Sequence, residues 1–386
     1  MHGKSEVGWV PALFFLATLV ACGGGGGSGG DPSAATPPAS RAGTPPPGNG
    51  AGFVYVANSG SNNVSVYSID SSGILSEISG SPFAAGVGPT SIAIDPAGKF
   101  AYVANGGSAD FTDTVSAYAI NAASGALTSV GAVSTQRLSP RSIAVDAGGR
   151  FVYTANGGSR TSGFGVLAYA INTGTGALSP VAGSPFTAGT NPSAVAVSPS
   201  GGIAYVTNQA SGDVSAFTID GTTGALTNAG RTAAGSAPLD VSVDPSGKFA
   251  YVVNFDGVLG YAINSATGAL TSVGPAVAAG SVPVSIAVHP SGNFAYVTNV
   301  GSNDVSSYRI NATTGALTSI GPAVAAGTRP NSVAVASSGN YAFVSNGDSN
   351  DISVFAIDLA TGALTPFGTP VAAGTGPISI TTTAVK

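Results

Sequence analysis

The chain has 386 residues, of which 43% are hydrophobic and only 8% are Asp, Glu, Lys or Arg, and its formal net charge is −5. A typical soluble protein has roughly 25% charged residues, and the few cations here form no cluster, which argues against a nucleic-acid partner. The 57 glycines and 25 prolines favour strands joined by turns over helices.

Residues 7–21 form an apolar stretch behind a short start that carries Lys4. A membrane span needs about 20 residues, so this stretch is short for one, and its length suits a secretory signal. It ends in Leu19-Val20-Ala21-Cys22, which resembles the lipobox of bacterial lipoproteins, and Cys22 is the only cysteine. The resemblance implies that residues 1–21 are cleaved and that Cys22 carries a lipid anchor. An ordinary signal peptide with a chance cysteine is the alternative.

The segment 22–52 is rich in Gly, Pro and other small residues and has too few apolar side chains to bury a core. We therefore expect a lipidated cysteine and a disordered tether in front of a folded domain over residues 53–386. Gly23 stands where inner-membrane lipoproteins have Asp, so the lipoprotein sorting pattern favours the outer membrane of a Gram-negative host. We expect an exported, membrane-anchored lipoprotein that faces the periplasm or the cell surface.

One alternating apolar phrase that ends in Asn recurs seven times, at intervals of 45 to 52 residues. A second phrase of the type VSAYAIN, a third of the type TGALTSVG and a fourth of the type PxSIAVD complete each repeat. Four short strands per repeat of this length are typical of a β-propeller blade. The sequence therefore predicts an all-β, seven-bladed β-propeller of four-stranded blades. The copies of the first phrase begin at Phe53, Phe100, Phe151, Ile203, Phe249, Phe294 and Tyr341.

The phrase Tyr-Val-Thr-Asn occurs literally at 205–208 and 296–299. Over essentially all of residues 53–386 the chain resembles the YVTN-repeat proteins and the lactonase-like seven-bladed propellers. The resemblance implies that the PxSIAV strand is innermost and the YVxN strand second. Because the chain begins at a second strand and ends after an innermost one, we expect the C-terminal strand to pair with the N-terminal strands and close the ring, which removes exposed sheet edges.

His289 is the only histidine after the signal peptide, and it starts an HPSG turn in a slot that Asp95, Asp146 and Asp244 hold elsewhere. We expect an exposed turn residue on the face opposite the binding mouth. A general base or a metal ligand is the alternative, but a single histidine cannot supply the clusters used by zinc or haem sites. No metal and no cofactor are expected.

Lactonase-type propellers have a Gly-Pro-Arg-His start to one inner strand, and the resemblance implies that its Arg and His reach the pocket. Here Pro140-Arg141-Ser142 keeps the arginine and has serine in place of the histidine, and no other inner strand supplies it. Asp240 stands where most blades have serine. No catalytic residue is therefore assigned with confidence, and Arg141 and Asp240 are the candidates.

We expect Arg141, Asp240, Arg329 and Asn331 to line the mouth and bind a ligand, and solvent-facing loop residues are the alternative. The loops 106–114 and 157–165 are longer than their counterparts. Because binding residues concentrate on loops held by a rigid scaffold, Phe111 and Phe164 at their tips are expected to add to a recognition lip. Neutral insertions are the alternative.

Two functions are compatible with these features. The first is a lipid-anchored, monomeric propeller of the cell envelope that acts as a non-catalytic scaffold and binds a glycan, a peptide or an envelope protein. The second is a lactonase-like hydrolase related to the 6-phosphogluconolactonase propellers of carbohydrate metabolism. The missing histidine, the sparse charge and the export signal favour the scaffold.

Overall fold

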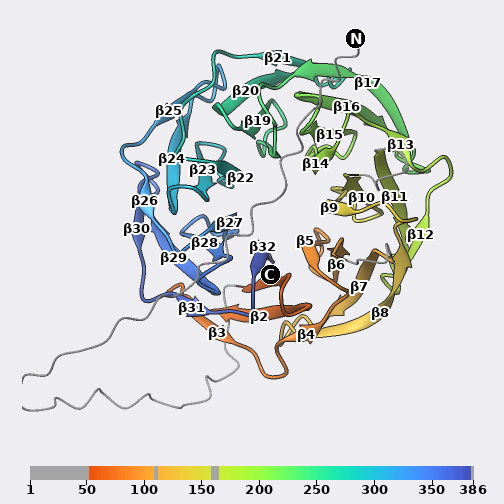
Figure 1. The fold of residues 1–386 in the computed structure, drawn as a ribbon, viewed down its shortest axis with the longest axis horizontal. Coiled ribbons are helices and arrows are strands. Elements are labelled where there is room, and N and C mark those ends of the chain that lie inside the picture. The colour runs from red at the N-terminus through yellow and green to blue at the C-terminus, as the bar shows by residue number, and fades with distance from the viewer. Residues whose placement is uncertain (1–51, 108–111, 158–164, 384–386) are drawn as a thin grey trace, which may run out of the picture. The chain divides into compact units, whose positions relative to one another are not determined.

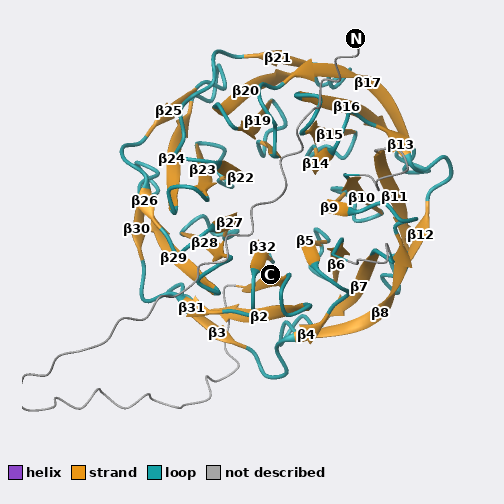
Figure 2. Ribbon diagram, viewed as in Figure 1, coloured by secondary structure: helices purple, strands orange, loops and turns teal. Residues whose placement is uncertain are grey.

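The structure is a computed structural model that describes residues 52–107, 112–157 and 165–383. In these ranges the chain forms 32 β-strands and no helix. The strands make seven antiparallel sheets, which are arranged as blades around a common centre (Figures 1 and 2). The prediction of an all-β, seven-bladed β-propeller is confirmed.

Each blade has four strands in the same order from the centre outwards, and a blade is named below by its innermost strand. The innermost strands are β5 (Pro89–Ile94), β9 (Pro140–Val145), β14 (Pro192–Val197), β18 (Asp240–Val243), β22 (Pro283–Val288), β27 (Pro330–Val335) and β32 (Pro377–Thr382). The second strands are β1 (Gly52–Asn58), β6 (Phe100–Asn105), β10 (Phe151–Asn156), β15 (Ile203–Asn208), β19 (Phe249–Asn254), β23 (Phe294–Asn299) and β28 (Tyr341–Asn346).

The outer half of each blade contains the third and fourth strands. The third strands are β2 (Asn63–Ile69), β7 (Thr114–Ile120), β11 (Gly165–Ile171), β16 (Asp213–Ile219), β20 (Gly257–Ile263), β24 (Asp304–Ile310) and β29 (Asp351–Ile357). The fourth strands are β3 (Leu75–Glu77), β8 (Leu127–Ser134), β12 (Leu178–Pro180), β17 (Leu226–Ala233), β21 (Leu270–Ser272), β25 (Leu317–Ser319) and β30 (Leu364–Pro366). Two-residue strands also pair with the third strand in four blades: β4 (Phe83–Ala84), β13 (Phe186–Thr187), β26 (Val324–Ala325) and β31 (Val371–Ala372).

The two ends of the ring share one blade, as expected. The C-terminal strand β32 pairs antiparallel with β1, with Ile380 opposite Val56, and so becomes the innermost strand of a blade whose other strands come from the N-terminal side. Beyond β32, the Thr383 hydroxyl accepts a hydrogen bond from the Phe53 backbone N–H at 2.9 Å. Closure therefore uses the ordinary inner-to-second-strand pairing found in every other blade.

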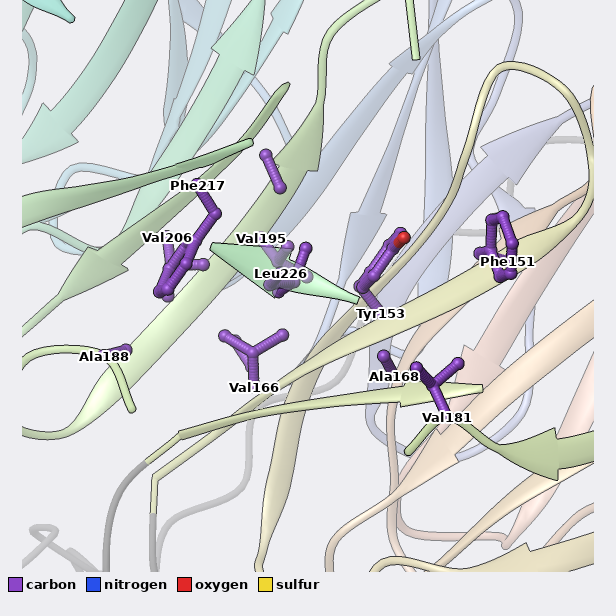
Figure 3. Packing of buried hydrophobic residues seen from close by; sticks show 12 residues of the cluster. Phe151, Tyr153, Val166, Ala168, Val181, Ala188, Val195, Val206, Phe217 and Leu226 are labelled. Atoms are coloured by element: carbon purple, nitrogen blue, oxygen red, sulfur yellow. The ribbon is translucent and has the colours of Figure 1, made fainter. Parts of the chain in front are cut away.

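The hydrophobic core is distributed between the blades. One cluster combines Tyr153 and Ala168 of the β9 blade with Val195 and Phe217 of the β14 blade (Figure 3). Since both faces of a second strand lie against apolar side chains, nearly every residue of these strands is buried, and their sequences read as apolar runs. Tyrosines of one blade lie over alanines and valines of another, which fills space without voids.

In every blade but the β27 blade, the tyrosine at the third position of the recurring phrase that ends in Asn bonds to a glycine carbonyl of the next blade. Buried Tyr153 donates its hydroxyl hydrogen bond to the Gly224 carbonyl at 3.0 Å. A Cβ on Gly224 would lie 2.3 Å from the Phe151 ring, and its φ of 75° also disfavours a side chain, so the TGAL phrase requires glycine. The same hydroxyl bond joins Tyr55 to Gly125, Tyr102 to Gly176, Tyr205 to Gly268, Tyr251 to Gly315 and Tyr296 to Gly362.

At the interface between the β27 blade and the β32 blade, which we call the closing interface, the two aromatic positions of the second strand exchange these roles. The β27 blade has Phe343 where the other blades have the bonding tyrosine, so no hydroxyl is available there. Tyr341, at the preceding aromatic position, donates instead to the Ser72 carbonyl at 2.7 Å. Its ring occupies the space where a Cβ on Gly73 would lie, 2.4 Å from the nearest ring atom. The closing interface therefore keeps both contacts with a single side chain.

The strand-end asparagines hold the second and third strands together. Buried Asn208 donates from Nδ2 to Asp213 Oδ1 at 2.6 Å and to Ser215 Oγ at 2.9 Å, and its Oδ1 accepts the Gly189 N–H at 2.9 Å. Asn58, Asn299 and Asn346 bond to the third strand in the same way. These side chains serve the architecture.

The expectation that His289 is exposed is wrong, because its side chain is buried with 4% of its surface accessible. Its Nδ1 accepts the Ser291 N–H at 3.0 Å, and Nε2 lies 2.9 Å from the Gly339 carbonyl oxygen of the next blade. The Phe294 ring packs edge-on against the imidazole. The turn is pressed against the neighbouring blade, so His289 acts as an interblade contact.

In the ranges given above, no helix long and apolar enough to cross a membrane is present. Cys22, Phe111 and Phe164 lie outside the described residues.

Removal of residues 377–386 is expected to lower the melting temperature by more than about 5 °C, because β32 and its buried Ile380 are lost and β1 becomes an open edge. Thermal unfolding followed by circular dichroism measures the change. A matched chain that ends at Thr383 keeps every bond of the closing strand and should melt like the full protein. Equal melting of both truncations would show that closure contributes little.

Candidate functional site

The starts of the seven inner strands lie around the centre of the ring (Figure 1). Each inner strand pairs its first residues with the last residues of the second strand of its blade, so the loops that follow the second strands lie at the same end. We call this end of the ring the mouth. All four candidates that the inner-strand sequences supplied belong to it: Arg141, Asp240, Arg329 and Asn331.

The residue after the first proline of an inner strand often bonds to the next inner strand. The Thr90 hydroxyl donates to the Pro140 carbonyl at 2.8 Å, and the Ser193 hydroxyl to the Pro238 carbonyl at 2.8 Å. Asn331 does the same from Nδ2 to the Pro377 carbonyl at 2.9 Å. Asn331 therefore lies at the mouth, but its amide group links two blades.

The following residue forms a second set of links between inner strands. Serine hydroxyls at this position accept the backbone N–H of the residue one step further along the next inner strand. These bonds run to Ser91 from Ile143 at 3.3 Å, to Ser142 from Val195 at 3.2 Å, to Ser332 from Ile380 at 3.4 Å and to Ser379 from Ile92 at 3.3 Å. Ser142, which stands in the histidine position of the lactonase-type motif, is thus a link between blades.

Asp240 occupies this serine position and accepts two backbone hydrogen bonds, one from the next blade and one from its own strand. Its Oδ2 accepts the Ile286 N–H of the next blade at 2.9 Å, which is the ordinary link. Its Oδ1 accepts the Val241 N–H at 2.8 Å. The preceding blade has Ala194 at the linking position, and alanine has no acceptor for that N–H. One carboxylate oxygen of Asp240 therefore makes the link to the next blade, and the other accepts the Val241 N–H for which Ala194 has no acceptor.

Burial raises the pKa of the half-buried Asp240 to about 6, against the opposing effect of the bonds from Ile286, Val241 and the Ser285 hydroxyl. An ordinary Asp titrates near 3.9. A carboxyl group with a pKa close to neutrality can exchange a proton during a reaction. These three bonds use three of the about four lone-pair sites of the carboxylate, so one site remains for a further donor.

Arg141 keeps its guanidinium open to solvent. Nη1 donates to Gln209 Oε1 at 3.0 Å, and the same oxygen accepts from Asn191 Nδ2 at 2.9 Å. A Cβ on Gly157 would lie only 2.5 Å from Arg141 Nε, so the side chain passes directly over that glycine. Desolvation by the surrounding mouth lowers the pKa of Arg141 below its ordinary value, but arginine stays cationic at neutral pH.

Arg329 belongs to a separate group. Its Nη1 lies 3.5 Å from Asp348 Oδ1, and the two side chains are 59% and 57% exposed, so the pair is a weak surface ion pair. In the described part of the chain, no hydrogen bond or ion pair joins any two of Arg141, Asp240, Arg329 and Asn331.

Gln209, Asn191 and Gly157 did not emerge from the sequence as site residues. Gln209 follows the second-strand Asn, where the other blades have Ser59, Gly106, Gly157, Phe255, Val300 or Gly347. Comparison of the repeats at that position would have marked it as a deviation, but its contact with Arg141, 68 residues away in the sequence, required the ring.

Two other features bear on the site. No group of three or more His, Cys, Asp or Glu side chains that could hold a metal ion occurs within the ranges that the structure covers. An apolar groove lies away from the inner strands, among the third and fourth strands of two neighbouring blades, and is lined by Val115, Val130, Val133 and Leu178. Because this groove is lined by apolar side chains, the candidate polar residues remain those of the mouth.

Comparison with known proteins identifies the family. The family model described as "Lactonase, 7-bladed beta-propeller" matches residues 49–188, 180–284 and 275–380. No curated protein matches the sequence. A solved structure from Bacteroides uniformis, assigned as a 6-phosphogluconolactonase, is 19% identical with a TM-score of 0.77, over 86% of this chain and 98% of its own. The periplasmic gluconolactonase of Pseudomonas aeruginosa is 21% identical with a TM-score of 0.71, over 87% and 99%.

The expectation of a non-catalytic binding scaffold is wrong. The lactonase family model matches nearly the whole propeller, and the similar structures carry lactonase names, which together favour the hydrolase alternative. The scaffold hypothesis gave too much weight to the missing histidine. One side chain of a family motif can change while the cationic group at the mouth is kept.

The stability contribution of Asp240 is expected to depend on pH. Between about pH 4 and pH 6 the folded protein holds a proton that the unfolded chain has lost, so this contribution falls as the pH rises through that window. Asp240→Asn removes the titration. Urea unfolding should show a larger loss of unfolding free energy for Asp240→Asn at about pH 4.5 than at about pH 7.5.

Ser332→Ala, which removes a link without removing a carboxyl group, serves as the control and should give the same loss at both pH values. A loss for Asp240→Asn that does not change with pH would contradict the raised pKa.

Proposed function

Because the chain belongs to the lactonase family of seven-bladed β-propellers, we propose that it hydrolyses a sugar lactone at the mouth of the ring. The observation that carries the proposal is that the guanidinium of Arg141 is exposed to solvent at the mouth. The corresponding side chains of Thr90, Ser193 and Asn331 are used in bonds between inner strands, whereas Arg141 presents a cation to solvent. The similar structures from Bacteroides and Pseudomonas, named 6-phosphogluconolactonase and gluconolactonase, support a lactone of a sugar acid as substrate.

Arg141 binds the carbonyl oxygen of the lactone in this proposal. Water adds to the carbonyl carbon, and the negative charge that develops on the oxygen is stabilised by the guanidinium N–H groups. The ring C–O bond then breaks, and the ring oxygen takes up a proton and leaves as a hydroxyl group. The acyl group becomes a carboxylic acid, which releases its proton to solvent and remains as a carboxylate. A guanidinium is suited to both species, because its donors match a carbonyl oxygen and the two oxygens of a carboxylate.

Asp240 is the proposed general base. Its carboxylate takes a proton from the attacking water and returns it to the departing ring oxygen, for which a pKa of about 6 is suitable at neutral pH. The two backbone N–H bonds and the Ser285 hydroxyl bond hold the group in one orientation and leave one lone-pair site for a water molecule. The base is thereby moved from the histidine position of the family motif to a carboxylate on a different inner strand.

Arg141→Ala is expected to lower kcat/KM for lactone hydrolysis by about 100-fold, since it removes the donor to the developing oxyanion. Arg309→Ala is the matched control, because Arg309 bonds to the Ala360 and Thr361 carbonyls of the neighbouring blade, away from the mouth. Hydrolysis of 6-phosphogluconolactone and of unphosphorylated sugar lactones is followed by proton release. No turnover above background by the wild-type protein with any lactone would falsify the proposal.

The role of Asp240 predicts that the wild-type rate rises with pH through about 6, as the carboxyl group loses its proton. Asp240→Asn should lower kcat and remove this rise. The pH dependence of kcat in both proteins measures it. A profile that is unchanged in Asp240→Asn would assign the base to another group.

We also propose that Cys22 anchors the exported protein in a membrane. The support is the Leu-Val-Ala-Cys sequence behind an apolar segment of signal type. In cells fed a labelled fatty acid, the wild-type chain should incorporate label and sediment with membranes. Cys22→Ser should incorporate none, and label on that variant would contradict lipidation at this residue.

A further inference from the structure

Gln209 is the residue that links Arg141 to the neighbouring blade. Its amide oxygen accepts two hydrogen bonds, from Arg141 Nη1 at 3.0 Å and from Asn191 Nδ2 at 2.9 Å. The backbone N–H of Gln209 donates to the Asn191 carbonyl at 2.9 Å, which fixes the loop on which the amide stands. The amide oxygen therefore has a defined position, and it points to a cation of another blade.

Gly157 limits the other side of Arg141. A Cβ at this glycine would lie 2.5 Å from Arg141 Nε, 3.1 Å from Cζ and 3.0 Å from Asn191 Oδ1. Its φ lies outside the left-handed region, so the backbone conformation itself does not require glycine there. The free space above Gly157 is what the guanidinium uses.

We propose that Gln209 is a positioning residue that, with the seat above Gly157, holds the guanidinium of Arg141 in its working orientation for the lactone carbonyl. The inference rests on the proposed function. A free arginine side chain has considerable rotamer entropy to lose when it binds a ligand, and the Gln209 bond restricts the side chain before substrate arrives. The bond uses Nη1 and leaves donors on Nη2 and Nε for the substrate oxygen.

The contact is poorly suited to a role in stability. It is solvent-exposed, and exposed polar contacts of charged side chains contribute little to folding stability. A small misplacement of a group that acts on the transition state costs much more in rate than in stability. Gln209→Ala is therefore expected to lower kcat about tenfold with little change in melting temperature.

A double-mutant cycle on the full chain tests this role. Gln209→Ala should reduce kcat/KM in the wild-type background and have no further effect when Arg141→Ala is already present, because the amide acts through the guanidinium. Gln209→Glu keeps an acceptor for Nη1 and should retain most of the activity. Val300→Ala, at the same loop position of another blade, is the control and should match wild type. Losses that multiply in the double variant would overturn the proposal.

Gly157→Ala provides a second perturbation, because the new methyl group meets Arg141 Nε and Asn191 Oδ1 and leaves the Gln209 side chain itself unaltered. The flexible guanidinium can move aside, so melting should change little while kcat falls as in Gln209→Ala. A kcat of Gly157→Ala equal to that of the wild type would show that the space above Gly157 does not position Arg141.

A readout that needs no turnover separates failure of this inference from failure of the proposed function. Phenylglyoxal modification of Arg141, followed by mass spectrometry of its peptide, should be at least about threefold faster in Gln209→Ala than in wild type or Val300→Ala, because a guanidinium without its partner is more accessible. An unchanged modification rate overturns the positioning role. A wild-type protein without lactone turnover overturns the proposed function while the modification rates still test the contact.

Discussion

The bond from a second-strand tyrosine to a glycine carbonyl of the next blade is the contact on which the ring depends. A single blade cannot cover its own two apolar faces, so each repeat must be matched to its neighbour. The aromatic ring at the start of the second strand occupies the space that a glycine side chain would take, as Phe151 does over Gly224, and the Tyr153 hydroxyl binds the carbonyl of the same glycine. This one interface explains why the second strand has two aromatic positions and why every TGAL phrase keeps its glycine. At the closing interface Tyr341 satisfies both demands alone.

The need to join each blade to its neighbour also engages most of the polar groups at the mouth in hydrogen bonds. Hydroxyl and amide groups at the starts of the inner strands link one strand to the next. Asp240 makes such a link and also accepts the Val241 N–H of its own strand, for which Ala194 has no acceptor. In a repeat protein of this kind, chemistry is left to side chains that exceed the needs of the architecture. Arg141 is such a side chain, and Asp240 has both a structural use and a raised pKa. We propose that these two groups act in one reaction, and membership of the lactonase family supports this.

Much of the fold could be predicted from the sequence, and much less of the site. The number of blades, the strand order and the closing strand follow from repeated phrases and from the resemblance that they carry. Arg141 and Asp240 could be placed at inner-strand starts by their position in the repeat, but Gln209 could not be paired with Arg141, because the contact crosses to another blade. His289 was expected to be exposed for a related reason: its turn chemistry is local, while its burial is produced by Gly339 of the next blade. The scaffold interpretation was wrong because it took the absence of the histidine from the lactonase-type motif as evidence against catalysis.

The sequence by itself determined the properties that act over a few residues: the alternation that makes strands, the turns that end them, and the interval that sets one blade after another. These properties recur seven times, so they can be recognised without knowledge of any long-range contact. The tertiary structure decided which polar groups remain free for a ligand and which neighbours hold them. Only ring formation brings Arg141 beside Gln209 of the next blade, because hydrogen bonding and desolvation at the mouth depend on residues that successive repeats contribute to one interface.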